Sequence, residues 1–203
     1  MYLIKLNLDP GHPSVRQGLR DRNDLHRNLM KAFQSPREDV HVLYRLIEKK
    51  DRLEVILLTG KEPDTVKWQN NGISVISSVD LSELPALYRE NAVLHFNLLA
   101  SPSKKSKEEG RTNSRRVFLS KAEDRQQWLQ RQSEKYGFEV LSVYEPTEPG
   151  MIRVGRNSGE FKLSAVEFDG VLRITDADLF WKSWEKGIGS EKAYGLGLLL
   201  LSK

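Results

Sequence analysis

The chemistry that this sequence offers most clearly centres on His26 and the cations near it. The segment from Asp21 to Phe33 predicts a helix, because its apolar residues recur at i, i+4, i+7 and i+8 and Asp21 suits the N-cap position. His26 follows the apolar stripe by about 100° of helical rotation, so we expect it at the rim of the core. Arg27 and Lys31 add positive charge to the same helix.

Imidazole exchanges protons near neutral pH, and a fixed cation stabilises charge that develops on a phosphate. RNA carries its own nucleophile, the 2′-hydroxyl, so a histidine among cations could cleave it without a metal. We therefore take His26 as the candidate proton-transfer group. Arg27 and Lys31 are the candidate catalytic cations, and Arg22 and Asn23 are candidate RNA contacts. A lone helical histidine is more often structural, so that alternative stays open on the residues alone.

Positive charge is concentrated in two segments of the 203-residue chain, whose formal net charge is +4. Segment 101–116 has two acids and six cations, an excess equal to the whole net charge; the cations are Lys104, Lys105, Lys107, Arg111, Arg115 and Arg116. Segment 14–37 has a second basic excess around His26. Such clusters predict a polyanionic partner, although surface cations that only aid solubility would look the same.

Two segments nearer the C-terminus place cations in settings that suit a phosphate. Alternating residues between 151 and 163 predict a basic β-hairpin. Its cations are Arg153, Arg156 and Lys162. Glycines recur over 187–197, and the backbone amides of such a turn, together with Lys192, can cradle a phosphate. This segment has no Gly-Lys-Ser/Thr of a P-loop, so a tight packing turn is an equal alternative.

Metal chemistry has little support in the sequence, and we expect no cofactor. The chain has no cysteine, so it has neither a disulfide framework nor a thiolate site, and a cytoplasmic location is the default expectation. No run approaches the roughly 18 apolar residues of a membrane span, so no membrane partner is expected. The histidines show no i, i+4 pairing; they are His12, His26, His41 and His95.

The order of predicted elements indicates an α+β protein with two tandem ferredoxin-like (RRM-like) βαββαβ domains. We expect an N-terminal domain over residues 1–91 with the His26 helix, and a C-terminal domain over 92–203 with the basic hairpin and the glycine-rich loop. Segment 101–116 lacks apolar residues before Val117, so we expect a loop there. The first half is expected to contain strands 2–8, 42–48 and 53–59 and helices 21–33 and 81–88. The second is expected to contain strands 93–100, 138–144, 151–154, 161–163, 171–175 and 194–201, and helices 120–136 and 176–186.

Five blocks in order along the chain resemble the CRISPR RNA-processing endoribonucleases of the CasE type, which belong to the repeat-associated RNA-binding superfamily. They are the opening strand from Met1; Asp24–Phe33; Arg116–Leu119 with Trp128-Leu129 and Gly137-Phe138; Ala165–Leu172; and the glycine-rich C-terminus. Each block alone is weakly specific, whereas five in sequence are specific and span nearly the whole chain.

This resemblance implies two ferredoxin-like domains and a metal-independent endoribonuclease that binds the hairpins of CRISPR repeats. It implies cleavage at the 3′ base of the stem, with 5′-hydroxyl and 2′,3′-cyclic phosphate products. His26 matches the family's catalytic histidine, and the 151–162 hairpin matches its contact with the RNA stem. The resemblance further implies that the processed guide RNA stays bound and that the protein joins a Cascade-type RNA-guided complex.

One position departs from the family pattern, because a tyrosine often stands three residues before the histidine and here the residue is Asn23. An amide cannot exchange a proton near neutral pH, although it can orient a phosphate or a 2′-hydroxyl. This departure supports an alternative function, a non-catalytic or weakly catalytic RNA-binding subunit that retains the processed RNA. A single-strand binder of the RRM kind is less well supported, because only Tyr194 offers a base-stacking ring in the last glycine-rich segment.

Overall fold

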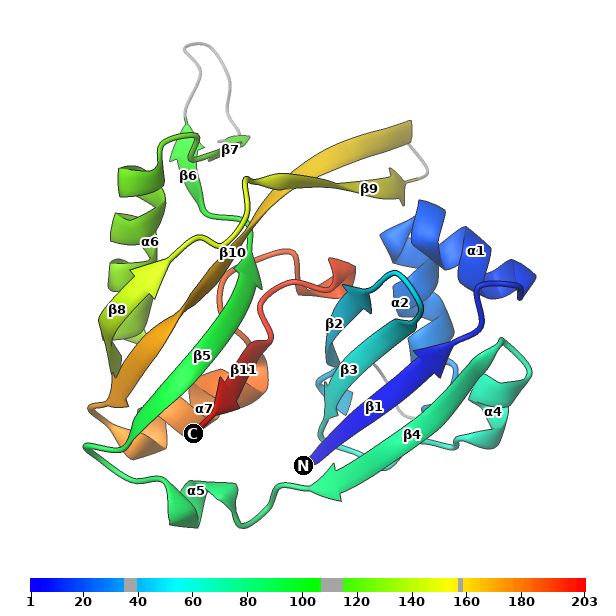
Figure 1. The fold of residues 1–203 in the computed structure, drawn as a ribbon, viewed down its shortest axis with the longest axis horizontal. Coiled ribbons are helices and arrows are strands. Elements are labelled where there is room, and N and C mark those ends of the chain that lie inside the picture. The colour runs from blue at the N-terminus through cyan, green and yellow to red at the C-terminus, as the bar shows by residue number, and fades with distance from the viewer. Residues whose placement is uncertain (35–39, 107–114, 157–158) are drawn as a thin grey trace.

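The computed structural model describes residues 1–34, 40–106, 115–156 and 159–203. Two antiparallel sheets lie side by side, and the short helix α5 (Leu84–Leu87) is part of the connection between them (Figure 1). The first sheet and its helices comprise β1 (Tyr2–Leu8), α1 (Pro13–Arg20), α2 (Arg22–Met30), β2 (Leu43–Glu48), β3 (Leu53–Thr59), α4 (Val66–Gln69) and β4 (Ile73–Asp80).

The second half of the chain has the same plan with two additions. Its main elements are β5 (Val93–Ala100), α6 (Ala122–Lys135), β8 (Phe138–Tyr144), β10 (Gly159–Ile174), α7 (Ala177–Lys186), the 3-10 helix η1 (Lys192–Tyr194) and β11 (Leu199–Ser202). The additions are the paired strands β6 (Ser103–Ser106) and β7 (Arg115–Phe118), and β9 (Gly150–Arg156), which pairs with β10.

The two sheets have equivalent strand orders, β2-β3-β1-β4 in the first and β11-β5-β10-β8 in the second. If β5, β8, β10 and β11 are numbered one to four, the second order is 4-1-3-2. The first order, taken from the β4 end, is also 4-1-3-2, which is the strand order of a ferredoxin-like domain. The predicted fold of two tandem ferredoxin-like domains is therefore confirmed. The expected boundary at residue 91 falls in the segment that joins the two sheets.

Each domain has its own hydrophobic core. In the first, Leu25 and Leu29 of α2 pack against the sheet, and Trp68 of α4 is fully buried in the same core, where its indole donates a 2.9 Å hydrogen bond to the carbonyl of Leu29. In the second, Trp128 of α6 and Phe180 of α7 pack on the central strands. The apolar faces of α2, α6 and α7 therefore hold these helices on their sheets, and the polar remainder of each helix is available for a site.

The sequence analysis misses the fourth strand of the first domain, and its helix 81–88 is not the second helix of that domain. The structure forms these two elements from β4 and α4 and places α5 in the connection, whereas strand 93–100 belongs to the second sheet, as expected. In β4, all residues except Ile73 are at least partly exposed, and the register against β1 shifts between Lys5 and Leu6. An exposed edge strand with a bulge lacks the alternation that identifies strands, so the sequence pattern could not indicate it.

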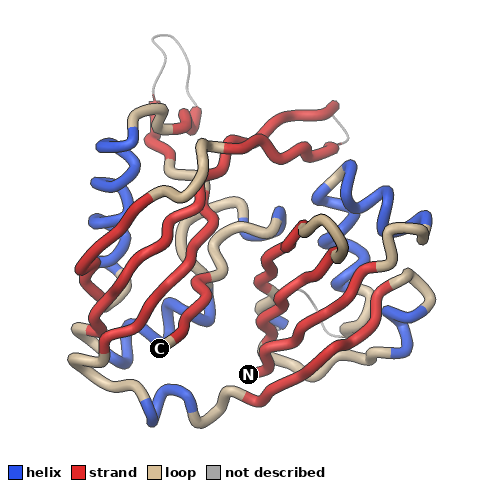
Figure 2. The backbone as a smooth tube through the Cα atoms, in the orientation of Figure 1, coloured by secondary structure: helices blue, strands red, loops and turns tan. Residues whose placement is uncertain are grey.

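Two other expectations for the second domain need correction. The basic segment 101–116 is not wholly a loop, because its ends form β6 and β7, which pair through backbone hydrogen bonds and need no apolar pattern. The expected strands 161–163 and 171–175 are parts of one continuous strand, the 16-residue β10. Its first half pairs with β9, so this hairpin projects from the second domain past the N-terminal end of α2 (Figures 1 and 2). None of the helices in the described ranges is long and apolar enough to cross a membrane.

Candidate active site and nucleic-acid interface

The helix that carries His26 begins where the sequence predicts. Asp21 is the N-cap of α2, and its carboxylate accepts a hydrogen bond of 2.9 Å from the amide of Asn23. Leu25 and Leu29 are buried in the first core, which fixes the rotation of the helix. α2 contacts both β9 and η1 of the second domain, and His26 lies on that side of the helix, because its ring stacks on Tyr44, whose hydroxyl lies 3.1 Å from the carbonyl of Ala193.

His26 is more deeply buried than we expected from its place beside the apolar stripe. Its side chain is only 5% exposed, and its ring stacks on that of Tyr44 in β2, with the centroids 6.2 Å apart and the planes 19° from parallel. The rim position predicted by helical rotation alone did not allow for the second domain, which covers this side of α2. A phosphate therefore reaches the imidazole only if neighbouring side chains move.

Tyr44 connects the His26 helix to the glycine-rich segment of the other domain. Its ring is fully buried, and its hydroxyl lies 3.3 Å from the carbonyl of Arg22 and 3.1 Å from that of Ala193. Burial raises the pKa of Tyr44 above its ordinary value, and the charge of Arg22 opposes that rise. Gly195 has a φ of 85°, and a Cβ there would come within 2.9 Å of the Tyr44 ring, so the turn needs glycine at this position.

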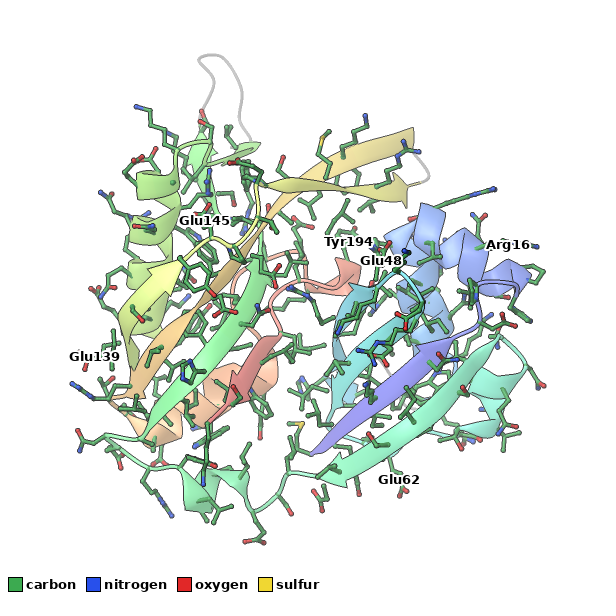
Figure 3. All side chains as sticks on the ribbon, viewed as in Figure 1. Arg16, Glu48, Glu62, Glu139, Glu145 and Tyr194 are labelled. Carbon is green, nitrogen blue, oxygen red and sulfur yellow. The ribbon has the colours of Figure 1, made fainter. Side chains whose placement is uncertain are left out.

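Arg22 brings a cation to the start of this helix, one turn before His26. Its Nη2 donates a 2.8 Å hydrogen bond to Glu48, the last residue of β2, which is labelled in Figure 3. Its Nη1 is buried and has no hydrogen-bond partner among the described residues. Residues i and i+4 share a helix face, so Arg22 has an unused donor on the His26 side of α2.

The structure does not bring Arg27 and Lys31 to the His26 face. Arg27 is 63% exposed and pairs with Asp24, and the Lys31 ammonium donates a 2.9 Å hydrogen bond to Asn71. Both line a pocket of about 590 Å³ between α1 and α2 that His26 does not line. Lys31 is five residues past His26, which is about 140° around the helix. Of the predicted cations on α2, Arg22 is therefore the one on the same face as His26.

A basic groove runs across the second domain near this junction. It consists of two adjoining pockets of about 310 and 640 Å³ between the β6–β7 pair, α6, the glycine-rich segment and β10. Its cationic residues are Lys105, Arg116, Lys135 and Lys162, and its aromatic residues are Phe118, Trp128, Tyr136 and Phe161. Glu191 lines the second pocket. Within the described ranges, no ion pair joins any of these four cations to a carboxylate.

Lys192 shows that positive charge accumulates beside this groove. It is half-buried in η1, and desolvation lowers its pKa, as do the nearby charges of Lys135 and Lys186. A bound anion would relieve this repulsion, since an opposite charge favours the protonated ammonium. Tyr194 of the same turn packs edge-to-face on Phe161 of β10, 6.0 Å between centroids, and Figure 3 shows it between the hairpin and β2. The glycine-rich segment is thus both a packing turn and a neighbour of the basic groove.

The β9–β10 hairpin places its cations as the sequence predicts, as far as the described side chains show. Arg153 and Lys162 are exposed and lie directly opposite each other in the pairing register, so they share one face. Like charges opposite each other destabilise a sheet unless an anion lies between them. Lys104 is exposed on β6, next to Lys105. Four other predicted RNA-binding residues cannot be placed: Lys107 and Arg111 lie outside the described residues, and only the backbone is described for Arg115 and Arg156.

Sequence reasoning missed the residues that organise the site. In the sequence, Tyr44 looks like any buried strand residue and Glu48 like any residue next to a turn, so nothing local indicates that either belongs to a functional site. From the sequence, Lys135 is one more surface cation in the last turn of a helix, and only the fold shows that it lines the groove. Among the described residues, no three acidic or histidine side chains form a group that could hold a metal ion.

Comparisons with known proteins agree with this arrangement. The family described as CRISPR associated protein matches residues 1–203. The CRISPR-associated endoribonuclease Cse3 of Thermus thermophilus is 30% identical, with 98% of each chain covered. The CRISPR system Cascade subunit CasE of Escherichia coli is 27% identical over 100% of this chain and 99% of its own. Thermus thermophilus Cse3 bound to an RNA representing a pre-cleavage complex superposes with a TM-score of 0.84 at 26% identity, covering 100% of this chain and 98% of that one.

Two ferredoxin-like domains with a histidine-bearing helix at their junction, together with a family match over the whole chain, place this protein in the CRISPR-associated protein family. The resemblance noted in the sequence is thereby confirmed. Within the family, the chain is an endoribonuclease of the CasE type, the group that includes Cse3.

Proposed function

We propose that this protein is a metal-independent endoribonuclease that binds the stem-loop of a CRISPR repeat in a precursor RNA. It cleaves at the 3′ base of the stem and keeps the processed guide RNA within a Cascade-type complex. The observation that carries the proposal is the position of His26, which stacks on Tyr44 beside the glycine-rich segment, on a helix whose first turn contacts the basic hairpin near its tip. The relatives that carry endoribonuclease and Cascade names support it.

The proposed reaction uses the RNA's own 2′-hydroxyl. The 2′-oxygen attacks the adjacent phosphorus and displaces the 5′-oxygen of the next nucleotide, which gives a 2′,3′-cyclic phosphate and a 5′-hydroxyl. One proton must leave the 2′-hydroxyl and one must reach the leaving 5′-oxygen, and His26 balances the step by accepting the first and delivering a proton to the second. The buried Nη1 of Arg22 is the donor best placed to stabilise charge on the phosphate. The geometry therefore favours Arg22 over Arg27 and Lys31 as the assisting cation.

The cations around this site have separate proposed roles in binding and in catalysis. Arg153 and Lys162 of the hairpin, with the basic groove, are suited to the phosphates of a folded RNA, whose charge compensates theirs. Asn23 offers no proton exchange, and its side-chain amide lies 3.4 Å from the carbonyl of Gly155. It therefore acts in the contact between the domains. A weakly catalytic subunit that mainly retains the processed RNA is the competing function, and a cleavage assay separates the two.

The proposal is tested by incubating the purified protein with a synthetic repeat RNA in the presence of EDTA. We expect cleavage at one phosphodiester at the 3′ base of the stem, and none when the stem sequence is changed so that it cannot pair. If the paired RNA is bound tightly but is not cut at this position, the proposed cleavage is wrong and retention of the RNA is the main function.

The groove and the hairpin make a separate prediction about binding. Replacing Arg116 or Lys162 with alanine is expected to weaken RNA binding, and to reduce the slope of log K against log salt by about one unit for each phosphate that the variant no longer neutralises. The measurement is a salt titration of Kd with RNA that carries a 2′-deoxy nucleotide at the cleavage site. Lys67→Ala on α4, whose cation pairs with Asp64, is the matched control. An unchanged slope in both test variants would remove these residues from the RNA-binding surface.

A further inference from the structure

Asp21 makes a contact between the domains that its role as a helix cap does not require. Its Oδ1 accepts the amide of Asn23, which caps α2, and also accepts the amide of Gly155 in β9 at 2.8 Å. Asn23 in turn directs its side-chain amide at the carbonyl of Gly155, at 3.4 Å. Both backbone groups of one hairpin residue are thus bound by the first turn of the helix that carries His26.

Gly155 has a position in the hairpin that makes this contact possible. β9 pairs with β10 along one side only, with Gly155 opposite Glu160, so its other edge is free to meet α2. A Cβ on Gly155 would lie 2.4 Å from Oδ2 of Asp21, well inside contact distance. The absence of a side chain at Gly155 is therefore what allows the hairpin to approach the helix.

We propose that Asp21 is a positioning residue, and that its contact with Gly155 fixes the distance between the RNA stem on the β9–β10 hairpin and the imidazole of His26. This inference rests on the proposed function, in which the hairpin holds the stem. His26 is five residues from Asp21 on one short helix, and Arg153 is two residues from Gly155 on one strand. The hydrogen bond between Asp21 and Gly155 therefore connects the stem to the His26 helix rigidly, and this connection selects the phosphodiester that meets His26.

The physical consequence is a separation of binding from chemistry. The proposed stem-binding residues lie on the hairpin and in the groove, so RNA affinity does not depend on Asp21. Cleavage does depend on it, since a displacement of about 1 Å between reacting groups costs up to about 100-fold in rate. Without the hydrogen bond to Gly155, neighbouring phosphodiesters can also reach His26, so the products become less uniform.

The test uses two variants that break the contact from opposite sides. Asp21→Ser keeps an N-cap for α2, because serine is a good cap, but its shorter side chain does not reach Gly155. Gly155→Ala leaves Asp21 unchanged and pushes the hairpin away. Asp21→Asn keeps the acceptor oxygen and is the conservative rescue. Gly150→Ala is the matched control in the same strand, because a Cβ at Gly150 has no atom within 4 Å.

Single-turnover cleavage at saturating repeat RNA and Kd for the 2′-deoxy RNA are measured for each variant. We expect Asp21→Ser and Gly155→Ala to cut at about one-tenth to one-hundredth of the wild-type rate and to produce additional cleavage positions, with Kd within about threefold. Asp21→Asn and Gly150→Ala should behave as wild type. Wild-type rates and a single product in both disrupting variants would overturn the proposal, as would a rate reduction that matches the decrease in folded protein.

A readout that needs no catalysis keeps this inference distinct from the proposed function. Hydrogen exchange of the first-turn amides of α2 is measured with and without the 2′-deoxy RNA. We expect RNA bound to the hairpin to slow this exchange in the wild type, and to leave it unchanged in Gly155→Ala although the hairpin is still protected. Equal protection of α2 in both proteins would overturn the role of Asp21. A wild-type protein that never cleaves the repeat would contradict the proposed function and leave this exchange result to decide the role of Asp21.

Discussion

Replacing His26 with alanine is expected to slow cleavage of the cognate repeat about 100- to 10,000-fold at saturating RNA, the usual effect of removing a proton-transfer group. Binding should hardly change, because the predicted stem-binding residues lie on the β9–β10 hairpin and in the basic groove, and the buried His26 lines neither pocket of that groove. The measurement is a single-turnover rate in EDTA together with Kd for the 2′-deoxy RNA.

This variant needs a control for packing, because the His26 ring is buried against Tyr44. His26→Gln fills more of the space and carries no group that exchanges a proton near neutral pH. Both variants should lose cleavage equally, although alanine should lower the free energy of unfolding more. Cleavage retained by His26→Gln would show that the imidazole only packs, the alternative that the sequence alone leaves open.

The second large effect is expected at Tyr44. Truncation to alanine removes a fully buried ring between α2 and the glycine-rich segment and should lower the free energy of unfolding by about 3 to 5 kcal/mol. Tyr44→Phe keeps the ring and removes only the hydroxyl that faces the carbonyls of Arg22 and Ala193, so its cost should be about 1 to 3 kcal/mol. Chemical denaturation of both variants checks the order.

Tyr44→Phe also tests a pH dependence. Because burial raises the pKa of Tyr44 in the folded state above the unfolded value, the folded protein binds this proton more tightly. The stability from this group is complete below a pH of about 10, the ordinary tyrosine value, and is lost as pH rises above it. We expect the wild type to lose more stability than Tyr44→Phe between neutral and strongly alkaline pH. Parallel pH curves for the two proteins would show that Tyr44 is not held in its neutral form.

Much of the fold was predictable because its main helices and strands bury regular apolar faces. The α2 helix has Leu25 and Leu29 at four-residue spacing and an aspartate cap, and the structure has the same cap. The strand β4 was not predictable, since its side chains are largely exposed and its position depends on hydrogen bonds to β1. The helix α1 was missed for a similar reason, because it buries only Val15 and Gly18.

The candidate site was predictable in its residue types but not in its geometry. His26 and the hairpin cations stand out in the sequence, and a resemblance to a known family identifies the histidine. The partners of these residues come from distant positions, as Tyr44 does from β2 and Gly155 from β9, and no local pattern marks them. Which cation shares a helix face with His26 follows from the three-dimensional rotation of α2, and this selects Arg22 where charge alone suggested Arg27 and Lys31.

The chemistry of the cleaved ends decides whether the RNA's own 2′-hydroxyl is the nucleophile. The wild-type protein is incubated in EDTA with repeat RNA and with the same RNA carrying a single 2′-deoxy nucleotide just before the scissile phosphate, and the products are analysed by mass. We predict 5′-hydroxyl and 2′,3′-cyclic phosphate ends from the first RNA and no cleavage of the second. Cleavage of the 2′-deoxy RNA at the same position, or products with a 5′-phosphate, would contradict the proposed mechanism.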